Sequence, residues 1–541
     1  MRDENESRTA AVSTDTLVAP ELTPRERAAA PRRFPTAEVA VAVGAFALFC
    51  IVVLTKATKL LEPDDSAYLA SIIALTHGHI TLSTAQYDAL SAQLSARDGT
   101  GILQWIQLSN GRFMSEKNPG YPFFAAPFQM LGILRATPLF AGALGATSLF
   151  VAGRRWLGKW GGTFAVILFL FSGAAIAFAW RPTMPSFSDA ALVAAGAGAL
   201  LWTFLADDAS ARRRSVVGLL GFVSLEAAVF MRYTDVVMLV VAAIAVGLLF
   251  RKAGIGVRSL AWWFGSVLVF AAGVMTFDQS FYGGAFKTGY GAGEITFGLG
   301  AILPNLKLMP SNLVKAIPAL LLGLAALAWM AVRVVRSRST AADAISASRI
   351  RRDAVIGLVL AAGWFGLWTL YSAYNWTAQT GAAGGGGPGG GGGGGAIHTI
   401  RFYLPAIGLI ALLSAWLLVQ LPKRFPAAVL AIVAVVALTS FYSLTAAGAV
   451  GALGGVVFPG GLLHNGARGG RFAPPSVAGR LPKGLGSPPG GLAKRLGSPP
   501  GGLAKRLGSP PGGQPKGLRP GNGRAPAGSS SPRSSPSAGS K

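Results

Sequence analysis

The apolar stretch EVAVAVGAFALFCIVVLT, residues 38–55, decides the kind of fold that this chain adopts. Its eighteen residues carry one charge, and as a helix they are long enough to cross a hydrocarbon core of about 30 Å. Similar stretches recur as far as residue 446. The whole chain is 52% hydrophobic and 13% charged, with a mean hydropathy of +0.49. These values predict a polytopic membrane protein and exclude a secreted enzyme or a single-pass receptor.

Ten further stretches share this character, so we expect an all-α transmembrane bundle of about eleven spans. The predicted spans cover residues 38–55, 138–153, 162–180, 188–206, 216–231, 234–250, 260–277, 313–332, 354–371, 402–420 and 427–446. Residues 119–134 are also apolar, and we expect them to dip into the membrane.

Basic residues predict the orientation of the bundle. Positive clusters precede the first span and follow every second later span, and such clusters stay in the cytoplasm. Residues 1–37 therefore form a cytoplasmic segment without a cleaved signal peptide. The long connections 56–137, 278–312 and 372–401 face outward, and 56–137 would form a small helical subdomain. We expect the function on this outer face of the cell membrane.

Two segments have low complexity. Residues 384–395, GGGGPGGGGGGG, predict a flexible insert in an outer loop. The tail, residues 447–541, repeats the unit LAKRLGSPPGG in tandem from residue 492 and predicts disorder. Residues 459–541 hold thirteen Lys and Arg and no acid, half of the formal net charge of +26. We interpret the tail as a solubilising repeat, with a tether to anionic polymers as the alternative; a weak apolar run at 447–463 could add a twelfth span.

An acidic pair follows the first span, in EPDDSAYLASII at residues 62–73. Pro63 and the apolar residues after the pair predict that Asp64 and Asp65 lie at a helix start. Either carboxylate could simply cap that helix. The alternative is a general base, since a second carboxylate beside the first can have a raised pKa and face a hydroxyl acceptor.

The same loop ends in SEKNPGYPFF, residues 115–124. The turn formed by the two prolines and Gly120 would fix Lys117 at headgroup depth, where an ammonium group can hold a lipid phosphate. The alternative is an interfacial lysine with Tyr121 in the aromatic belt.

Further polar side chains lie at the predicted outer ends of other spans, next to aromatic residues. Each could be an interfacial anchor, but together they describe an outward-facing cavity with several cations around an acidic pair. They occur in RPTMPSFSD (181–189), MRYTD (231–235), FYGGAFKTGYG (281–291) and HTIRFYLPA (398–406), and the candidates are Asp189, Arg232, Lys287, Tyr290, His398 and Arg401.

Several chemistries lose support from what the sequence lacks. It has no GxxxxGK[ST] phosphate loop, no GxGxxG between a strand and a helix, and no HExxH motif. Its single cysteine, Cys50, cannot form a disulfide within the chain. We predict no metal site and no cofactor, although Asp64 and Asp65 are the one place where a divalent ion could bind, and we expect no nucleic-acid partner.

The order of these motifs resembles the integral-membrane glycosyltransferases of the GT-C class. The resemblance covers residues 38–446 and is to the bacterial branch of the dolichyl-phosphate-mannose protein mannosyltransferase and aminoarabinose lipid A transferase family. EPDDSAYL and SEKNPGYP carry it most specifically. The family often has Asp-Glu where this chain has Asp64-Asp65, and the insert at 384–395 is not part of its pattern.

The resemblance implies an inverting transfer of a sugar from a polyprenyl phosphate carrier to an envelope acceptor, which could be a protein, a polysaccharide or a lipid. It implies Asp64 as catalytic base with Asp65 beside it, and Lys117 and Arg401 as contacts of the donor phosphate. Two rival functions remain: a transporter or flippase of lipid-linked sugars, which would not need the acidic pair, and a membrane scaffold that displays the basic tail.

Overall fold

The computed structural model describes residues 37–55, 63–98, 101–290, 296–339, 344–382, 399–421 and 426–446. Three predicted segments lie outside these described residues: the cytoplasmic segment as far as residue 36, the flexible insert at 384–395 and the disordered tail at 447–541.

The described chain is a helical membrane bundle, as predicted. Seven helices are long and apolar enough to cross a membrane. They are α2 (Ala37–Thr55), α6 (Ala136–Leu157), α9 (Ser186–Leu205), α10 (Ala211–Met231), α12 (Val257–Tyr282), α14 (Ala319–Ser339) and α15 (Ala344–Ser372). The pair α7 (Lys159–Leu170) and α8 (Gly173–Ala179) is long and apolar enough when taken together, but it is bent by 59° at the break, as in a broken span or a re-entrant loop.

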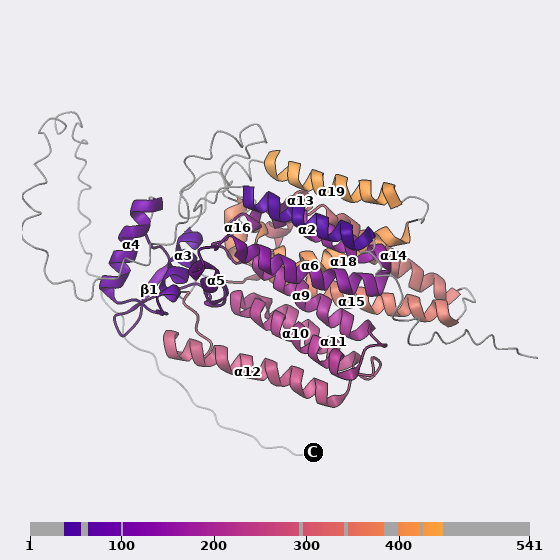
Figure 1. The fold of residues 1–541 in the computed structure, drawn as a ribbon, viewed down its shortest axis with the longest axis horizontal. Helices are drawn as coiled ribbons and strands as arrows, with labels where there is room; N and C mark the ends of the chain where they lie inside the picture. Colours follow the sequence, from indigo (N-terminus) through magenta and orange to yellow (C-terminus); the bar gives the residue numbers. More distant parts are fainter. Residues whose placement is uncertain are drawn as a thin grey trace, which may run out of the picture. The chain divides into compact units, whose positions relative to one another are not determined.

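Three further apolar helices complete the set of predicted spans: α11 (Val236–Leu249), α18 (Ile407–Gln420) and α19 (Pro426–Ala446). Each of the eleven predicted stretches thus contains helix. The chain is a multi-pass membrane protein. Figure 1 shows the long helices of the described part running alongside one another.

One predicted boundary is wrong. The span predicted at 313–332 begins only at Ala319, because residues up to Ala316 belong to a separate helix, α13 (Ile302–Ala316). Pro318 separates the two helices, since it cannot donate a backbone hydrogen bond. Hydropathy misses α13 because prolines and polar residues interrupt its apolar sequence, ILPNLKLMPSNLVKA; its buried residues are Asn305, Met309, Leu313 and Ala316.

The described residues of the loop predicted at 56–137 form three helices, α3 (Pro63–Thr76), α4 (Thr84–Asp98) and α5 (Gly120–Met130). The loop also contains an antiparallel hairpin that the sequence did not predict, with β1 (Trp105–Gln107) paired to β2 (Phe113–Ser115) and Ile106 opposite Met114. The hairpin returns the chain to α3, so that the residues after Ser115 begin beside that helix. Short elements elsewhere are α16 (Asn375–Ala382) and the 3₁₀ helices η1 (Tyr233–Asp235), η2 (Leu299–Ala301) and η3 (Leu404–Ala406).

Helix α9 is the most deeply buried of the long spans, and it packs against α6 and α10. Glycines allow the close approach of α6. A Cβ atom on Gly198 would lie 2.7 Å from the carbonyl carbon of Ser148, and one on Gly145 would lie 2.8 Å from the carbonyl oxygen of Ala191. Small residues at such contacts let dispersion act between backbones, which stabilises helix pairs within a membrane.

We expect Gly198→Val to destabilise the bundle by about 1–3 kcal/mol, because the added side chain must push α6 away from α9. The matched control is Gly247→Val on α11, where a Cβ would meet no described atom within 4 Å. Thermal unfolding in detergent should show a lower midpoint for Gly198→Val only. Equal midpoints for the two variants would contradict the close packing of α6 and α9.

Candidate functional site

The two aspartates at the start of α3 point in different directions. Consecutive residues of an α-helix are about 100° apart around its axis, so adjacent side chains face different surroundings. Asp65 is fully buried, whereas the side chain of Asp64 is 16% exposed. The acidic pair of the sequence is therefore two separate carboxylates with different partners.

Asp64 lies between two cations from distant parts of the chain. Its Oδ1 is 3.1 Å from Nζ of Lys117, and its Oδ2 is 2.9 Å from Nη1 of Arg401. Both cations are nearly buried, so Asp64 is the most accessible of the three side chains. This triad of Asp64, Lys117 and Arg401 is the candidate site.

Lys117 is fixed by the turn that follows β2. Its backbone N–H donates to Oγ of Ser115 at 3.2 Å, and its ammonium group is 3.0 Å from Oε1 of Glu116. Burial lowers the pKa of Lys117, but the carboxylates of Asp64 and Glu116 more than offset this and leave that pKa raised. The lysine therefore stays charged at neutral pH.

A close backbone contact brings Tyr290 to the same place. A Cβ on Gly289 would lie 2.4 Å from Cα of Glu116, so the chain can approach this closely only with glycine there. The ring of Tyr290 lies under the ammonium group of Lys117, with 4.8 Å from Nζ to the ring centroid. Burial raises the pKa of Tyr290 well above its usual value, and Asp64 and Glu116 act in the same direction, so its hydroxyl group stays neutral.

Arg401 is held by aromatic rings and by its own backbone. Its guanidinium carbon is 4.9 Å from the ring centroid of Phe402 and 5.5 Å from that of Trp376. Nη1 of Arg232 donates a hydrogen bond of 2.7 Å to the carbonyl oxygen of Arg401. The segment before η3 is thereby anchored to the end of α10.

Arg232 in turn lies against a buried acidic cluster. Its Nε is 3.6 Å from Oδ2 of Asp189 in the first turn of α9, and its Nη2 is 3.4 Å from Oγ of Ser186. Asp189 and Asp235, at the starts of α9 and α11, are both fully buried. The cluster connects three helix ends to the backbone of Arg401.

Asp65 fastens α3 to the segment between α8 and α9. It accepts hydrogen bonds from Arg181 and, at 2.6 Å, from Oγ1 of Thr183. Tyr121 binds the same segment, since its hydroxyl group donates to the carbonyl oxygen of Pro182 at 2.5 Å. Tyr121 of the PGYP turn and Asp65 thus both bind the segment between α8 and α9.

The structure brings together some of the residues predicted for the site. Asp64, Lys117, Tyr290 and Arg401 meet at one point, and Asp189 and Arg232 adjoin them through the backbone of Arg401. Asp65 and Tyr121 face away from this point, Lys287 is exposed, and His398 lies outside the described residues.

Two site residues were missed from the sequence. Glu116 precedes Lys117 in SEKNPGYPFF, and this position directly beside a candidate cation could have indicated an ion pair with Lys117. Trp376 lies next to the Gly-rich insert, and nothing in the sequence there connects it to Arg401. Within the described ranges, no group of three or more His, Cys, Asp or Glu side chains is placed to hold a metal ion.

Comparison with known proteins gives distant structural likenesses only. No protein-family model matches the sequence, and a search of curated proteins finds no match. One similar solved structure is ArnT from Cupriavidus metallidurans in the apo state, with 14% identity, a TM-score of 0.41, and coverage of 74% of this chain and 62% of that one. Another is the oligosaccharyltransferase AglB from Archaeoglobus fulgidus in complex with an inhibitory peptide and a dolichol-phosphate, with 12% identity, a TM-score of 0.42, and coverage of 77% and 56%.

ArnT bound to undecaprenyl phosphate is similar at 14% identity and a TM-score of 0.39, with coverage of 77% of this chain and 69% of that one. The chain spans less than two thirds of the length of the apo ArnT and AglB structures. Similarity at this level carries no argument about function, so the proposal below depends on the geometry of the site.

We expect Asp65→Asn to unfold the protein more easily while Asp64→Asn does not. Removing the carboxylate from Asp65 breaks its buried ion pair with Arg181, which costs about 3–5 kcal/mol. Asp64 is partly exposed, and without its charge Lys117 keeps Glu116 as a partner. Thermal unfolding of the two variants in the same detergent measures the difference, and a lower midpoint for Asp64→Asn than for Asp65→Asn would refute it.

Proposed function

We propose that this protein is a membrane glycosyltransferase that moves a sugar from a polyprenyl-phosphate donor to an acceptor of the cell envelope, on the extracytoplasmic face and with inversion at the anomeric carbon. The observation that carries the proposal is the triad, in which a partly exposed carboxylate lies between two nearly buried cations. We assign the chain to the GT-C class on this geometry and on the EPDDSAYL and SEKNPGYP motifs.

The two cations suit the leaving group of such a reaction. A polyprenyl phosphate leaves with negative charge on its phosphate oxygens, and fixed cations lower the energy of that charge most effectively where water is scarce. The guanidinium group of Arg401 can bind two phosphate oxygens at once, while Lys117 supplies a point charge. The lipid chain of the donor stays in the bilayer, so no nucleotide-binding fold is needed.

Asp64 suits the role of general base for the acceptor hydroxyl. Both of its carboxylate oxygens form ion pairs in this structure, one with Lys117 and one with Arg401. A donor phosphate would compete for both cations and so release the carboxylate. This gives an order of events, with the donor bound before the base is free to accept a proton.

Asp65 has a positioning role in this proposal. Its oxygens are occupied by Arg181 and Thr183, and it is fully buried. It holds the first turn of α3 in place, and through that turn it sets the position of Asp64. The acidic pair thus divides into one reacting carboxylate and one supporting carboxylate.

The decisive test is transfer of labelled sugar from a panel of polyprenyl phosphate donors in membranes that contain the full chain. We expect Asp64→Asn to lower the transfer rate by roughly 10²- to 10⁴-fold, the usual contribution of a general base. Lys117→Met and Arg401→Met should each lower it by about 10²-fold or more through the loss of charge stabilisation.

Matched controls are Asp208→Asn and Lys159→Met. Asp208 is an exposed carboxylate paired with Arg155, and Lys159 is an exposed lysine at the start of α7. Equal transfer by the wild type and Asp64→Asn would overturn the assignment of the base. Movement of the donor across the membrane without consumption of its sugar would favour the flippase instead.

A further inference from the structure

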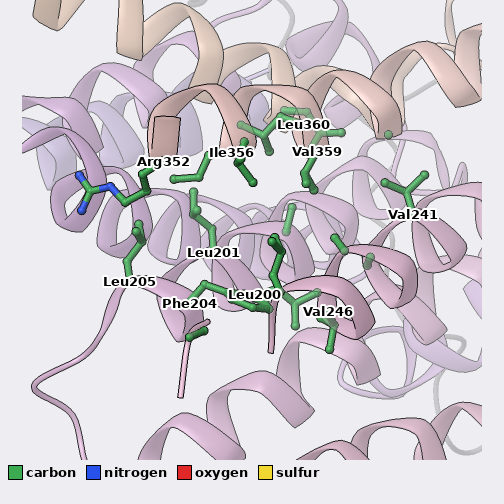
Figure 2. A pocket seen from close by; sticks show the side chains of 18 of the residues that line it. Leu200, Leu201, Phe204, Leu205, Val241, Val246, Arg352, Ile356, Val359 and Leu360 are labelled. Carbon is green, nitrogen blue, oxygen red and sulfur yellow. The ribbon is translucent and has the colours of Figure 1, made fainter. Parts of the chain in front are cut away.

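A cavity that is separate from the triad lies among the membrane-spanning helices. It measures about 440 Å³ and is enclosed mainly by α9, α11 and α15. Figure 2 shows Leu200 and Leu201 on one side and Val359 and Leu360 on the other, with Val241 farther along. Its lining is predominantly apolar, and the size is that of a site for a small ligand or a lipid chain.

The cavity leads to the opposite end of the helices from the triad. On α9, Asp189 lies in the first turn near Arg232, whereas Leu205, which lines the cavity, is the last residue of the helix. Sixteen residues separate these two positions, about 24 Å along a helix. Helix α15 runs in the opposite direction to α9. Arg351 and Arg352, near the start of α15, line the cavity, whereas Tyr371 lies near the end of α15.

Three cations gather at this end of the cavity. Arg351, Arg352 and Lys252 all line it and are all exposed. Two carboxylates lie nearby: Asp207, which also lines the cavity, and Asp353, whose Oδ1 is 3.8 Å from Nε of Arg352. Figure 2 shows Arg352 at one end of the row of apolar side chains. An apolar cavity that ends in a cluster of cations complements a molecule with an apolar chain and an anionic head.

The arginines are carried on a firmly held part of α15. Asp353, the next residue, accepts hydrogen bonds from the indole N–H groups of Trp156 at 3.0 Å and Trp416 at 3.1 Å. These bonds fix α15 to α6 and α18. The backbone that carries Arg351 and Arg352 is therefore fixed at the cavity mouth, and this reduces the conformational entropy lost when a ligand binds.

We propose that this cavity binds one anionic phospholipid, with an acyl chain among the apolar side chains and the phosphate at Arg351, Arg352 and Lys252. Arginine forks suit phosphate oxygens. The proposal is independent of the sugar transfer proposed above, because the donor phosphate of that reaction would lie at the triad, and Arg232 connects the triad to the start of α9, the opposite end of that helix from Leu205.

The test is native mass spectrometry of the full chain in detergent, titrated with phosphatidylglycerol and with phosphatidylcholine of identical acyl chains. We expect tighter binding of one phosphatidylglycerol. The double variant Arg351→Gln/Arg352→Gln should weaken it roughly thirtyfold, from the usual worth of two arginines at a lipid phosphate. Val359→Trp, which fills the cavity, should also weaken it.

The control for charge is Arg212→Gln/Arg258→Gln, which removes two exposed arginines that are not among the cavity's lining residues. Equal weakening by both double variants, or equal affinity for the two lipids, would overturn the proposal. So would binding of a polyprenyl phosphate that is lost in Val359→Trp but kept in Arg351→Gln/Arg352→Gln, since the cavity would then hold the tail of the sugar donor. Should the arginine variant fail to fold, the lipid comparison and Val359→Trp decide.

Discussion

The ion-paired Asp64 carboxylate is the constraint on which the arrangement at the triad depends. Bringing a carboxylate, an ammonium group and a guanidinium group out of water is costly, and their attraction repays the cost only when the geometry is well fixed. Each of the three comes from a different segment: the start of α3, the turn after β2, and the segment before η3. The surrounding contacts therefore serve to hold three separate segments at one point.

Those contacts differ in kind. Aromatic packing supports the loop that contains α3 and α5, where the rings of Tyr68 on α3 and Tyr121 on α5 meet edge to face at 5.8 Å. A backbone contact that admits only glycine brings Gly289 against Glu116. Buried hydrogen bonds that Asp65 accepts from Arg181 and Thr183 fix α3 itself. Buried ion pairs contribute little net stability. We therefore interpret the contacts that hold the triad together as serving the function of the site rather than the stability of the fold.

Hydropathy predicted the bundle because the lipid-facing surface of a membrane helix must be apolar whatever the helix contacts inside. It could not predict α13, whose apolar sequence is interrupted by prolines and polar residues, nor the β1–β2 hairpin, whose strands of three residues each are too short to show an alternating pattern. The predicted boundary at residue 313 failed because the last turn of α13 lies only two residues before the next span begins at Ala319.

The site was predictable as a set of motifs but not as a geometry. Asp64 and Lys117 stood out because charges at the ends of apolar stretches are conspicuous, and the resemblance to a known class singled out Arg401. The sequence could not separate Asp64 from Asp65, because that separation depends on which side of the first turn of α3 faces Arg181. The role of Trp376 could not be predicted, because its contact with Arg401 joins segments on either side of a long Gly-rich insert.

The position of Arg401 finally depends on how the long helices are packed. Arg232 binds the carbonyl oxygen of Arg401 and lies 3.6 Å from Asp189 at the start of α9. Asp235 starts α11, and the neighbouring Thr234 is hydrogen-bonded to Tyr371 of α15 at 2.5 Å. The helices α9, α11 and α15 that enclose the apolar cavity are therefore the same ones whose far ends set Arg232. The packing around the cavity and the position of Arg401 therefore depend on the same helices.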